Sequence, residues 1–416
     1  MTTAAQISTV LLAMLTTQAF PADSDSGHSN SWHQWRGPNR DGSIQTEAWP
    51  KTVSAGGLVK QVEIPLGESY SGPIVVGELV FTTETKGDTE SAIAINRNSG
   101  QEVWKTSWKG KMTVPFFAAS NGSWIRSTPA WHNNQLFVAS MEDVLYCLNS
   151  TDGKIVWQKD IRKEFGTANQ SFGFVCSPLV LDNHVFIQTS AGLLKIDCDT
   201  GETAFRTLNE SGGMMAGAFS SPVVATIAGV RQLVVQTRKA LTGVSVENGT
   251  VLWTQDIPAF RGMNILTPTI IGDSIFTSSY GGGSFLFDIA RTDDTFTVMQ
   301  RWKAKAEGYM SSAVQVGDQL YLHLRNQRFT SINVADGQSA WTTKPFGKYW
   351  SMVVNGKSAL ALDEKGILLL LNLNQKEFQE VDRLKVSDQE TWAHLAVSKN
   401  QIFIRDLKGL TIWQIQ

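Results

Sequence analysis

Residues 149–157 read Asn-Ser-Thr-Asp-Gly-Lys-Ile-Val-Trp, a polar turn and a glycine followed four residues later by a tryptophan. The arrangement recurs in the pairs Gly100/Trp104, Gly153/Trp157, Gly201/Phe205, Gly249/Trp253 and Gly337/Trp341. Trp302 continues the series after a longer turn, and successive aromatic residues lie 53, 48, 48, 49 and 39 positions apart. Short apolar alternations such as Ile93-Ala-Ile95 precede the turns, so the pattern predicts two strands joined by a turn at a regular period.

A second signature precedes each repeat, in the tripeptides Ser71-Gly-Pro73, Ser127-Thr-Pro129, Cys176-Ser-Pro178, Ser220-Ser-Pro222, Leu266-Thr-Pro268 and Ser311-Ser-Ala313. Hairpins with two-residue turns are predicted after it, at Gly77-Glu78, Asn133-Asn134, Asp182-Asn183, Gly272-Asp273, Gly317-Asp318 and Asn355-Gly356. Asn, Asp and Gly tolerate the positive φ that tight hairpin turns need. One unit is therefore a four-stranded antiparallel meander of about 45 residues, which is the period of a propeller blade.

The count of units predicts an all-β fold, an eight-bladed β-propeller of four-stranded antiparallel blades. Seven units begin near Ser71, Ser127, Cys176, Ser220, Leu266, Ser311 and Ser351. The last unit, residues 392–416, has three strands, predicted over 394–397, 401–405 and 410–415, with His394 at the start of the first. Residues 58–64 can supply the fourth strand, which would close the ring without exposed sheet edges. Seven blades is the alternative count. We therefore expect a signal peptide over 1–22, an N-terminal extension over 23–57, and a single propeller domain over 58–416.

Composition narrows the possible functions. The 416 residues carry a net charge of -2, which excludes a broad basic surface for nucleic acid. Charged residues make up only 18% of the chain, which contains 35 glycines and 14 tryptophans. This composition favours short strands and tight turns over long helices.

The N-terminus predicts export. The apolar run over residues 9–19 is shorter than the ~20 residues that span a bilayer and is typical of a signal peptide, with cleavage after Ala19 or Ala22. Because no Lys or Arg precedes Arg36, a misassigned start or a cytosolic protein is the alternative. We expect a periplasmic or secreted protein with no membrane span.

No motif predicts catalysis. The three cysteines, Cys147, Cys176 and Cys198, are far apart and form no CxxC, so buried free thiols are expected, with a disulfide between two of them as the alternative. The six histidines show no metal-ligand spacing, and neither a phosphate-binding GxxxxGK loop nor a GxSxG hydrolase turn occurs.

The repeat resembles the PQQ-like β-propeller repeat of exported bacterial proteins, which is shared by quinoprotein dehydrogenases and by BamB-like propellers of outer-membrane protein assembly. The resemblance spans about residues 32–416 and includes residues 35–42 (Trp-Arg-Gly-Pro-Asn-Arg-Asp-Gly), 228–235, 391–396 and 405–409. The resemblance to the dehydrogenases implies a site in which a quinone is held between a Trp and a vicinal Cys–Cys disulfide, with a bound calcium ion and an Asp base. This chain has no vicinal cysteines, so none of those residues can be carried over. No cofactor is expected, and PQQ with calcium is the alternative.

We therefore expect an exported, non-catalytic propeller that acts as a protein-interaction or cell-envelope assembly scaffold. It would be a monomer that binds a protein partner in the envelope. The alternatives are a PQQ- and calcium-dependent oxidoreductase with a divergent site, and a carbohydrate-binding propeller.

Candidate binding residues lie in the connections between blades and in the loops between second and third strands, where propellers usually bind ligands. Aromatic residues and arginine are typical of binding hot spots. The predicted face comprises Arg126, Phe174, Asn264, Tyr280, Tyr309, Arg325, Trp350, Trp392 and His394. A structural role, docking one blade on the next, is expected for Trp104, Trp157, Phe205, Trp253, Trp302 and Trp341. The segment at Trp35–Gly42 is expected to act as a staple across the blades, and residues 108–119 form the longest insertion, expected near the binding face.

Overall fold

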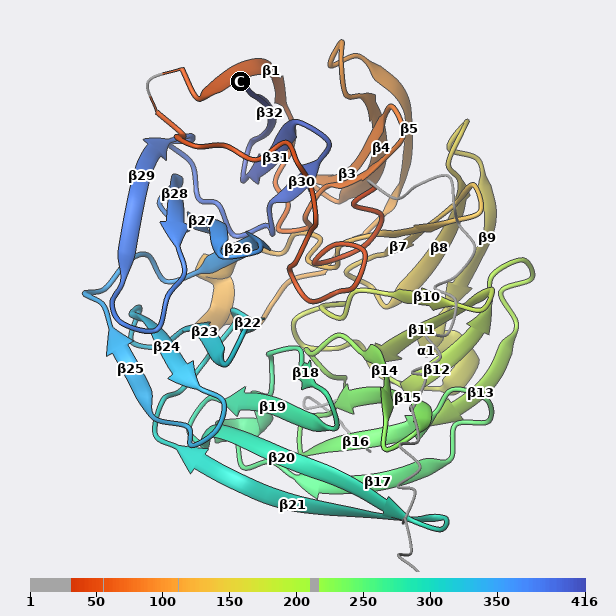
Figure 1. The fold of residues 1–416 in the computed structure, drawn as a ribbon. Coiled ribbons are helices and arrows are strands. Elements are labelled where there is room, and N and C mark those ends of the chain that lie inside the picture. The colour runs from red at the N-terminus through yellow and green to blue at the C-terminus, as the bar shows by residue number, and fades with distance from the viewer. Residues whose placement is uncertain (1–30, 55, 111, 210–216) are drawn as a thin grey trace, which may run out of the picture.

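The computed structural model describes residues 31–54, 56–110, 112–209 and 217–416. Within them, eight four-stranded antiparallel sheets stand in a ring, viewed along its axis in Figure 1. The predicted eight-bladed propeller is confirmed, and the alternative count of seven is wrong. The predicted signal peptide lies outside the described residues.

The first four blades follow in chain order. Blade 1 contains β2 (Ile74–Val76), β3 (Leu79–Lys86), β4 (Thr89–Asn96) and β5 (Glu102–Lys109). Blade 2 contains β6 (Ala130–His132), β7 (Gln135–Ala139), β8 (Val144–Asn149) and β9 (Ile155–Asp160). Blade 3 contains β10 (Leu179–Leu181), β11 (His184–Thr189), β12 (Gly192–Asp197) and β13 (Thr203–Thr207). Blade 4 contains β14 (Val223–Ile227), β15 (Val230–Gln236), β16 (Ala240–Ser245) and β17 (Val251–Asp256).

The remaining blades continue the ring. Blade 5 contains β18 (Thr269–Ile271), β19 (Ser274–Ser279), β20 (Gly283–Thr292) and β21 (Thr295–Ala304). Blade 6 contains β22 (Val314–Val316), β23 (Gln319–His323), β24 (Phe329–Asn333) and β25 (Ser339–Thr342). Blade 7 contains β26 (Trp350–Asn355), β27 (Ser358–Asp363), β28 (Ile367–Asn372) and β29 (Gln379–Lys385). Blade 8 contains β30 (Ala396–Ser398), β31 (Gln401–Asp406), β32 (Gly409–Ile415) and β1 (Leu58–Pro65). Short helical turns lie in the connections: η1 (Phe116–Asn121), α1 (Ile161–Phe165) and η3 (Phe260–Gly262).

The ring closes as the sequence predicts, with strands from both ends of the chain in blade 8. Strand β1 pairs antiparallel with β32, from Leu58 opposite Ile415 to Pro65 opposite Gly409. The sheet order β1-β32-β31-β30 leaves the N-terminal strand outermost. Closure therefore rests on an antiparallel ladder with one bulge, at Gln61, and on a buried cluster that includes Leu58 and Ile415.

Most predicted hairpin turns lie at the expected residues. Asn133 and Asn134 have φ of 45° and 61°, the positive values that these side chains tolerate. Blade 7 differs by one position, because Asn355 still pairs with Ser358 and the turn is Gly356-Lys357. In blade 8 the first strand begins at Ala396, so His394 precedes the strand in which it was expected.

The recurring aromatic residue packs on the next blade with the help of a β-bulge. In blade 1, Trp104 pairs with Ala94, and the register then shifts so that Val103 is the extra residue. A bulge bends its strand and redirects the neighbouring side chain. The Trp104 indole Nε1 donates to the carbonyl oxygen of Ser150 in blade 2 at 2.9 Å. A Cβ on Gly153, which has φ of 73°, would lie 2.6 Å from the indole, so the glycine and the tryptophan require each other across the blade boundary.

The junction between blades 4 and 5 departs from this pattern. Trp157, Trp302 and Trp341 also donate to a carbonyl of the following blade, at 2.8, 2.7 and 3.0 Å. Trp253 instead donates to Gln232 Oε1 in its own blade at 2.6 Å. The next blade carries the long β20–β21 hairpin, whose Phe296 and Val298 pack on the same apolar cluster as Trp253. The long hairpin takes the place of the Gly-containing turn, so the usual acceptor is missing there.

The second signature forms a belt of hydrogen bonds around the axis. The Thr128 hydroxyl accepts from the Gly72 backbone N–H at 3.0 Å, and the Ser177 hydroxyl accepts from the Thr128 N–H at 3.0 Å. Ser221 likewise accepts from the Ser177 N–H at 2.9 Å. Hydroxyls at these positions therefore satisfy backbone donors of the preceding blade, which explains the Ser or Thr found there in blades 2, 3 and 4.

Candidate functional site

The two faces of the ring are named by their loops. The connection face carries the segments that lead from the outer strand of one blade to the inner strand of the next, and the turn face carries the two-residue hairpins. The N-terminal segment, residues 31–46, crosses the middle of the ring and is red in Figure 1. Trp32 exchanges two backbone hydrogen bonds of 2.9 Å with Val75, and Val354 donates to the Gly42 carbonyl at 2.8 Å. The segment thus bridges blades 1 and 7.

Two buried arginines anchor this segment at the axis. Arg40 donates to the carbonyl oxygens of Pro178 at 2.7 Å, Ser177 at 3.0 Å and Pro222 at 3.0 Å. Arg36 donates to the Ala313 carbonyl at 2.6 Å. Burial lowers the pKa of each guanidinium to about 10, so both remain charged at neutral pH. The segment therefore ties blades 3, 4 and 6 together, and its geometry supports the predicted structural role of Trp35–Gly42.

His394 belongs to this axial group and not to an exposed face. Its ring stacks on Trp32 at 6.1 Å and meets the edge of Trp35 at 6.3 Å. Nδ1 contacts the Leu395 carbonyl at 2.8 Å. Loss of water contact, with the nearby charge of Arg36, lowers the pKa of His394 to about 3, so the ring is neutral at physiological pH. The structure thus places the half-buried His394 against the N-terminal segment, while the prediction that it belongs to a binding face stays a prediction.

The connection face carries a cluster of aromatic rings beside the axis. Tyr70 stacks on Trp392, with ring centroids 4.4 Å apart and an angle of 13° between the ring planes. The ring centroids of Tyr349 and Trp392 are 3.7 Å apart. Trp124 meets the edge of Tyr70 at 5.3 Å. The Arg126 guanidinium lies 5.4 Å from the centre of the Tyr70 ring, the distance of a cation–π contact. Segments preceding blades 1, 2, 7 and 8 thus meet at one place.

Polar atoms in this cluster have no partner among the described residues. The Tyr70 hydroxyl and the Trp392 indole nitrogen are buried and make no hydrogen bond there. Burial raises the pKa of the Tyr70 phenol well above its usual range, so it stays protonated. Most buried polar groups in proteins are hydrogen-bonded. Tyr70 and Trp392 are therefore two exceptions that lie in contact with each other on this face.

A second aromatic group lies on the same face, above blades 5 and 6. The Arg325 guanidinium lies 4.0 Å from the centre of the Tyr280 ring, and it donates to the Tyr280 hydroxyl at 3.0 Å. The Tyr309 and Tyr280 rings are 5.5 Å apart, and Phe260 meets Tyr280 at 5.2 Å. Arg325 also forms an ion pair with Glu307 at 3.2 Å. The group combines stacked rings with a half-exposed arginine.

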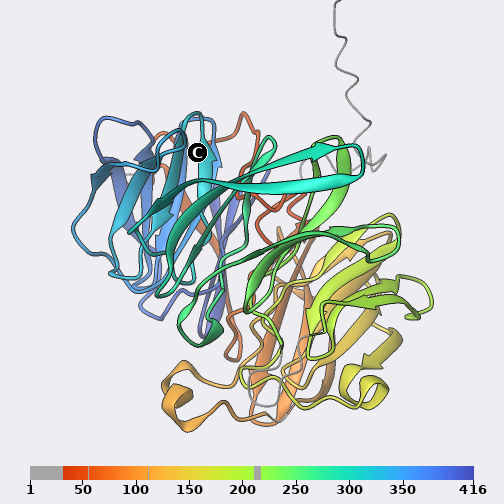
Figure 2. The same cartoon turned by 90° about the horizontal axis from the view of Figure 1, so that it is seen from below.

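Phenylalanines on the connection face are exposed to solvent. Phe116 is 91% exposed and Phe117 is 62% exposed, both on η1, and Phe260 is 48% exposed. The turn η1 projects from the ring in Figure 2, where it is orange. The Phe117 ring lies 6.3 Å from Phe172, which lies 5.7 Å from Phe219. These contacts form an aromatic ridge, defined here as Phe116, Phe117, Phe172 and Phe219. The insertion is shorter than expected, because Trp108 belongs to β5 and is buried.

Three predicted binding residues lie in the interior. Phe174 and Asn264 have no exposed surface, and Trp350 is 7% exposed. Trp350 stacks on His323 at 5.5 Å within the core of blades 6 and 7. These residues cannot line an exposed face, because their side chains point between blades. Arg126, Tyr280, Tyr309, Arg325 and Trp392 do lie on the connection face.

Sequence reasoning missed Tyr70, Phe219 and Phe260. A signal for the first existed, since Tyr70 immediately precedes Ser71-Gly-Pro73 just as Arg126 precedes Ser127-Thr-Pro129. Phe219 precedes the corresponding Ser220-Ser-Pro222. The residues that immediately precede the Ser-x-Pro tripeptides occupy equivalent places in their blades, so treating them as one set would have found Tyr70 and Phe219.

The residues present do not fit a PQQ and calcium site. Cys147, Cys176 and Cys198 are free, buried and separate, and burial raises the pKa of the Cys176 thiol to about 11. Across residues 31–416, apart from the undescribed positions, no group of three or more His, Cys, Asp and Glu side chains could hold a metal ion. The same residues include no helix long and apolar enough to cross a bilayer.

Fold and site together define a PQQ-like repeat propeller with a filled axis and an aromatic connection face. The family described as "Outer membrane protein assembly factor BamB" matches residues 88–343, more than half of the chain, and the chain belongs to this family. BamB of Yersinia pestis is 23% identical over 308 residues, which cover 71% of this chain and 70% of that protein.

Solved structures share the fold. BamB from Moraxella catarrhalis has a TM-score of 0.62 at 14% identity, covering 86% of this chain and 98% of that one. The quinohemoprotein alcohol dehydrogenase of Comamonas testosteroni has a TM-score of 0.68 at 11% identity, covering 94% and 81%. At such identities these likenesses show the architecture alone.

Proposed function

We propose that this protein is an exported, non-catalytic scaffold that assists outer membrane protein assembly by binding a protein partner through its connection face. Family membership supports the process, since the relatives are named as outer membrane protein assembly factors. The proposal places the chain in the periplasm as a monomer that needs no cofactor.

The exposed phenylalanines on the connection face are the observation that supports this proposal most strongly. Two adjacent rings, Phe116 and Phe117, face water on a projecting turn, where leaving them exposed costs free energy unless a partner covers them. Arginine paired with tyrosine at Arg126 and Arg325 adds the residue types enriched in binding hot spots. Together these groups form an apolar anchor with polar neighbours, which is the composition of a protein-binding interface.

Complementation in the host organism tests the proposal. The gene is deleted and replaced by wild type, by F116S/F117S, or by V103S/V156S, and the outer membrane protein content of isolated envelopes is measured. Val103 and Val156 are 49% and 50% exposed on outer strands, so their substitution removes exposed apolar surface away from the face. We expect wild type and V103S/V156S to restore the content and F116S/F117S to fail. Full complementation by F116S/F117S would contradict the proposed face.

A further inference from the structure

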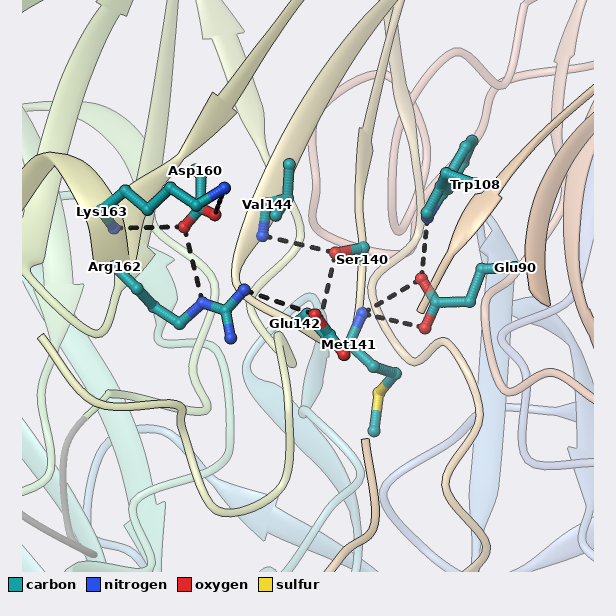
Figure 3. Close-up of polar contacts among 9 residues, drawn as sticks. All are labelled: Glu90, Trp108, Ser140, Met141, Glu142, Val144, Asp160, Arg162 and Lys163. Atoms are coloured by element: carbon teal, nitrogen blue, oxygen red, sulfur yellow. Dashed lines mark hydrogen bonds and ion pairs between the residues drawn. The ribbon is translucent and has the colours of Figure 1, made fainter. Parts of the chain in front are cut away.

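Glu90 is a fully buried carboxylate at the boundary of blades 1 and 2. It lies on β4, with no more than 1% of its surface exposed. Its Oε2 accepts from the Trp108 indole Nε1 at 2.9 Å, and its two oxygens lie 3.1 and 3.3 Å from the Met141 backbone N–H (Figure 3). One residue of blade 1 is thereby bonded to the loop that joins β7 and β8 in blade 2.

The donors that reach Glu90 are neutral. No ion pair joins Glu90 to a lysine or arginine of the described residues. The titratable groups that face it are Glu142 and Tyr146 of blade 2. Glu142 is itself paired with Arg162 at 3.4 Å, on the side away from Glu90 in Figure 3. An ionised Glu90 would therefore be a buried charge without a countercharge, and burial, reinforced by Glu142, raises its pKa to about 7.

Glu90 lies next to the start of the segment that carries the exposed Phe116 and Phe117. A Cβ on Gly110 would lie 2.2 Å from the Glu90 carboxyl carbon, so the chain leaves β5 directly against this carboxylate. Trp108, which Glu90 binds, stacks on Tyr146 at 4.3 Å. Val114 and Ala118 of the following segment belong to the same buried cluster as Trp108 and Met141. Phe172 of the aromatic ridge packs against that cluster.

We propose that Glu90 is a proton-controlled latch for residues 112–124. With Glu90 protonated, the segment packs down on Trp108 and Met141 and presents Phe116 and Phe117 in a fixed position. When Glu90 loses its proton to solvent, the carboxylate is more stable in contact with water, and opening the segment that shares the cluster of Trp108 and Met141 admits that water. The latch is a property of the fold and holds whether or not the connection face binds the partner proposed above.

Limited proteolysis with chymotrypsin tests the latch. The protease binds its substrate as an extended chain, so cleavage after the exposed Phe116 or Phe117 requires η1 and its flanking residues to unfold from the blades. The cleavage rate of folded wild type is divided by that of E90Q at each pH, which removes the protease's own pH dependence. Gln mimics the protonated acid, since its carbonyl at the Oε2 position can still accept from Trp108 and Met141. We expect this ratio to rise at least about tenfold between about pH 5.5 and about pH 8.5.

A matched variant, E142Q, removes the neighbouring charge and is expected to keep the rise while moving its midpoint to lower pH. A flat ratio for wild type over E90Q would overturn the latch, as would loss of the rise in E142Q. Hydrogen exchange of peptides within residues 112–124 of wild type, corrected for the intrinsic pH dependence, gives the same test without a variant. There, unchanged protection across pH 7 would also overturn it.

Discussion

The two ends of the propeller axis are built in opposite ways. Around the N-terminal segment, buried Arg36 and Arg40 use their donors on main-chain carbonyls of blades 3, 4 and 6. On the connection face, the Tyr70 hydroxyl and the Trp392 indole nitrogen are buried without a partner, and Phe116 is 91% exposed. The first end satisfies its polar groups and hides its apolar ones, while the second leaves two buried polar atoms without a partner and an aromatic ring in water.

This difference separates stability from binding. A buried cation held by several carbonyls is costly to disturb, because its removal leaves each acceptor dehydrated and unpaired. Removing a donor that makes no hydrogen bond from a stacked ring changes the free energy of unfolding little. We therefore expect substitutions at the N-terminal segment to change the free energy of unfolding, and substitutions on the connection face to change interactions with partners.

Arg40→Ala should have the largest effect on stability. The substitution leaves the carbonyls of Ser177, Pro178 and Pro222 without their donor in the interior. We expect the free energy of unfolding to fall by about 3–5 kcal/mol. Arg126→Ala is the control, since Arg126 also binds carbonyls but lies half-buried at the connection face, where water can replace it. Denaturant unfolding of both variants measures the difference, and equal losses would remove the contrast between the two ends.

A change of pH should alter the free energy of unfolding of wild type through Glu90, which lies beneath the connection face, by less than Arg40→Ala does. The pKa of Glu90 is about 7 in the folded state against 4.5 in the unfolded chain, so the folded state binds the proton more tightly. The contribution of Glu90 to the free energy of unfolding is therefore fully present below about pH 4.5. As the pH rises from there through 7, the free energy of unfolding falls by about 3 kcal/mol because of this group. The difference in unfolding free energy between E90Q and wild type isolates this contribution and should grow over the same interval. A difference that stays constant with pH would show that Glu90 is not the group responsible.

Tyr70→Phe should have the smallest effect. Its hydroxyl is buried without a partner, so removing the oxygen sacrifices no hydrogen bond and spares a desolvation cost. We expect the midpoint of thermal unfolding to stay the same or to rise slightly. The counterpart is Thr128→Val, which removes the hydroxyl that accepts from the Gly72 N–H and should destabilise by about 1 kcal/mol. A loss in Tyr70→Phe as large as in Thr128→Val would mean that the Tyr70 hydroxyl has a partner.

The sequence predicted the ring because turn chemistry is local. Gly153 needs a positive φ and cannot carry a side chain against Trp104, so the spacing of glycine and tryptophan is visible without any structure. The bulge at Val103 is not visible, because one extra residue leaves the apolar alternation almost unchanged. Blade number, ring closure and most turns followed from such local signals.

The binding face was less predictable, because side-chain direction depends on where each strand begins. Phe172 and Phe174 are two residues apart in one connection, yet the first joins the aromatic ridge and the second is fully buried. His394 was expected inside a strand, but it precedes β30 and meets the N-terminal segment, whose path through the axis no periodicity reveals. Contacts between segments distant in sequence decided these outcomes.

Photo-crosslinking in the living host shows whether the connection face binds a protein of the envelope. A photoreactive amino acid replaces Phe116 on the connection face or, as the matched control, Met299, which is 63% exposed on the outer strand β21. Cross-linked proteins are then identified by mass spectrometry. We expect a discrete adduct with an outer-membrane assembly protein from position 116 and none from position 299. The same adduct from both positions, or from position 299 alone, would contradict it.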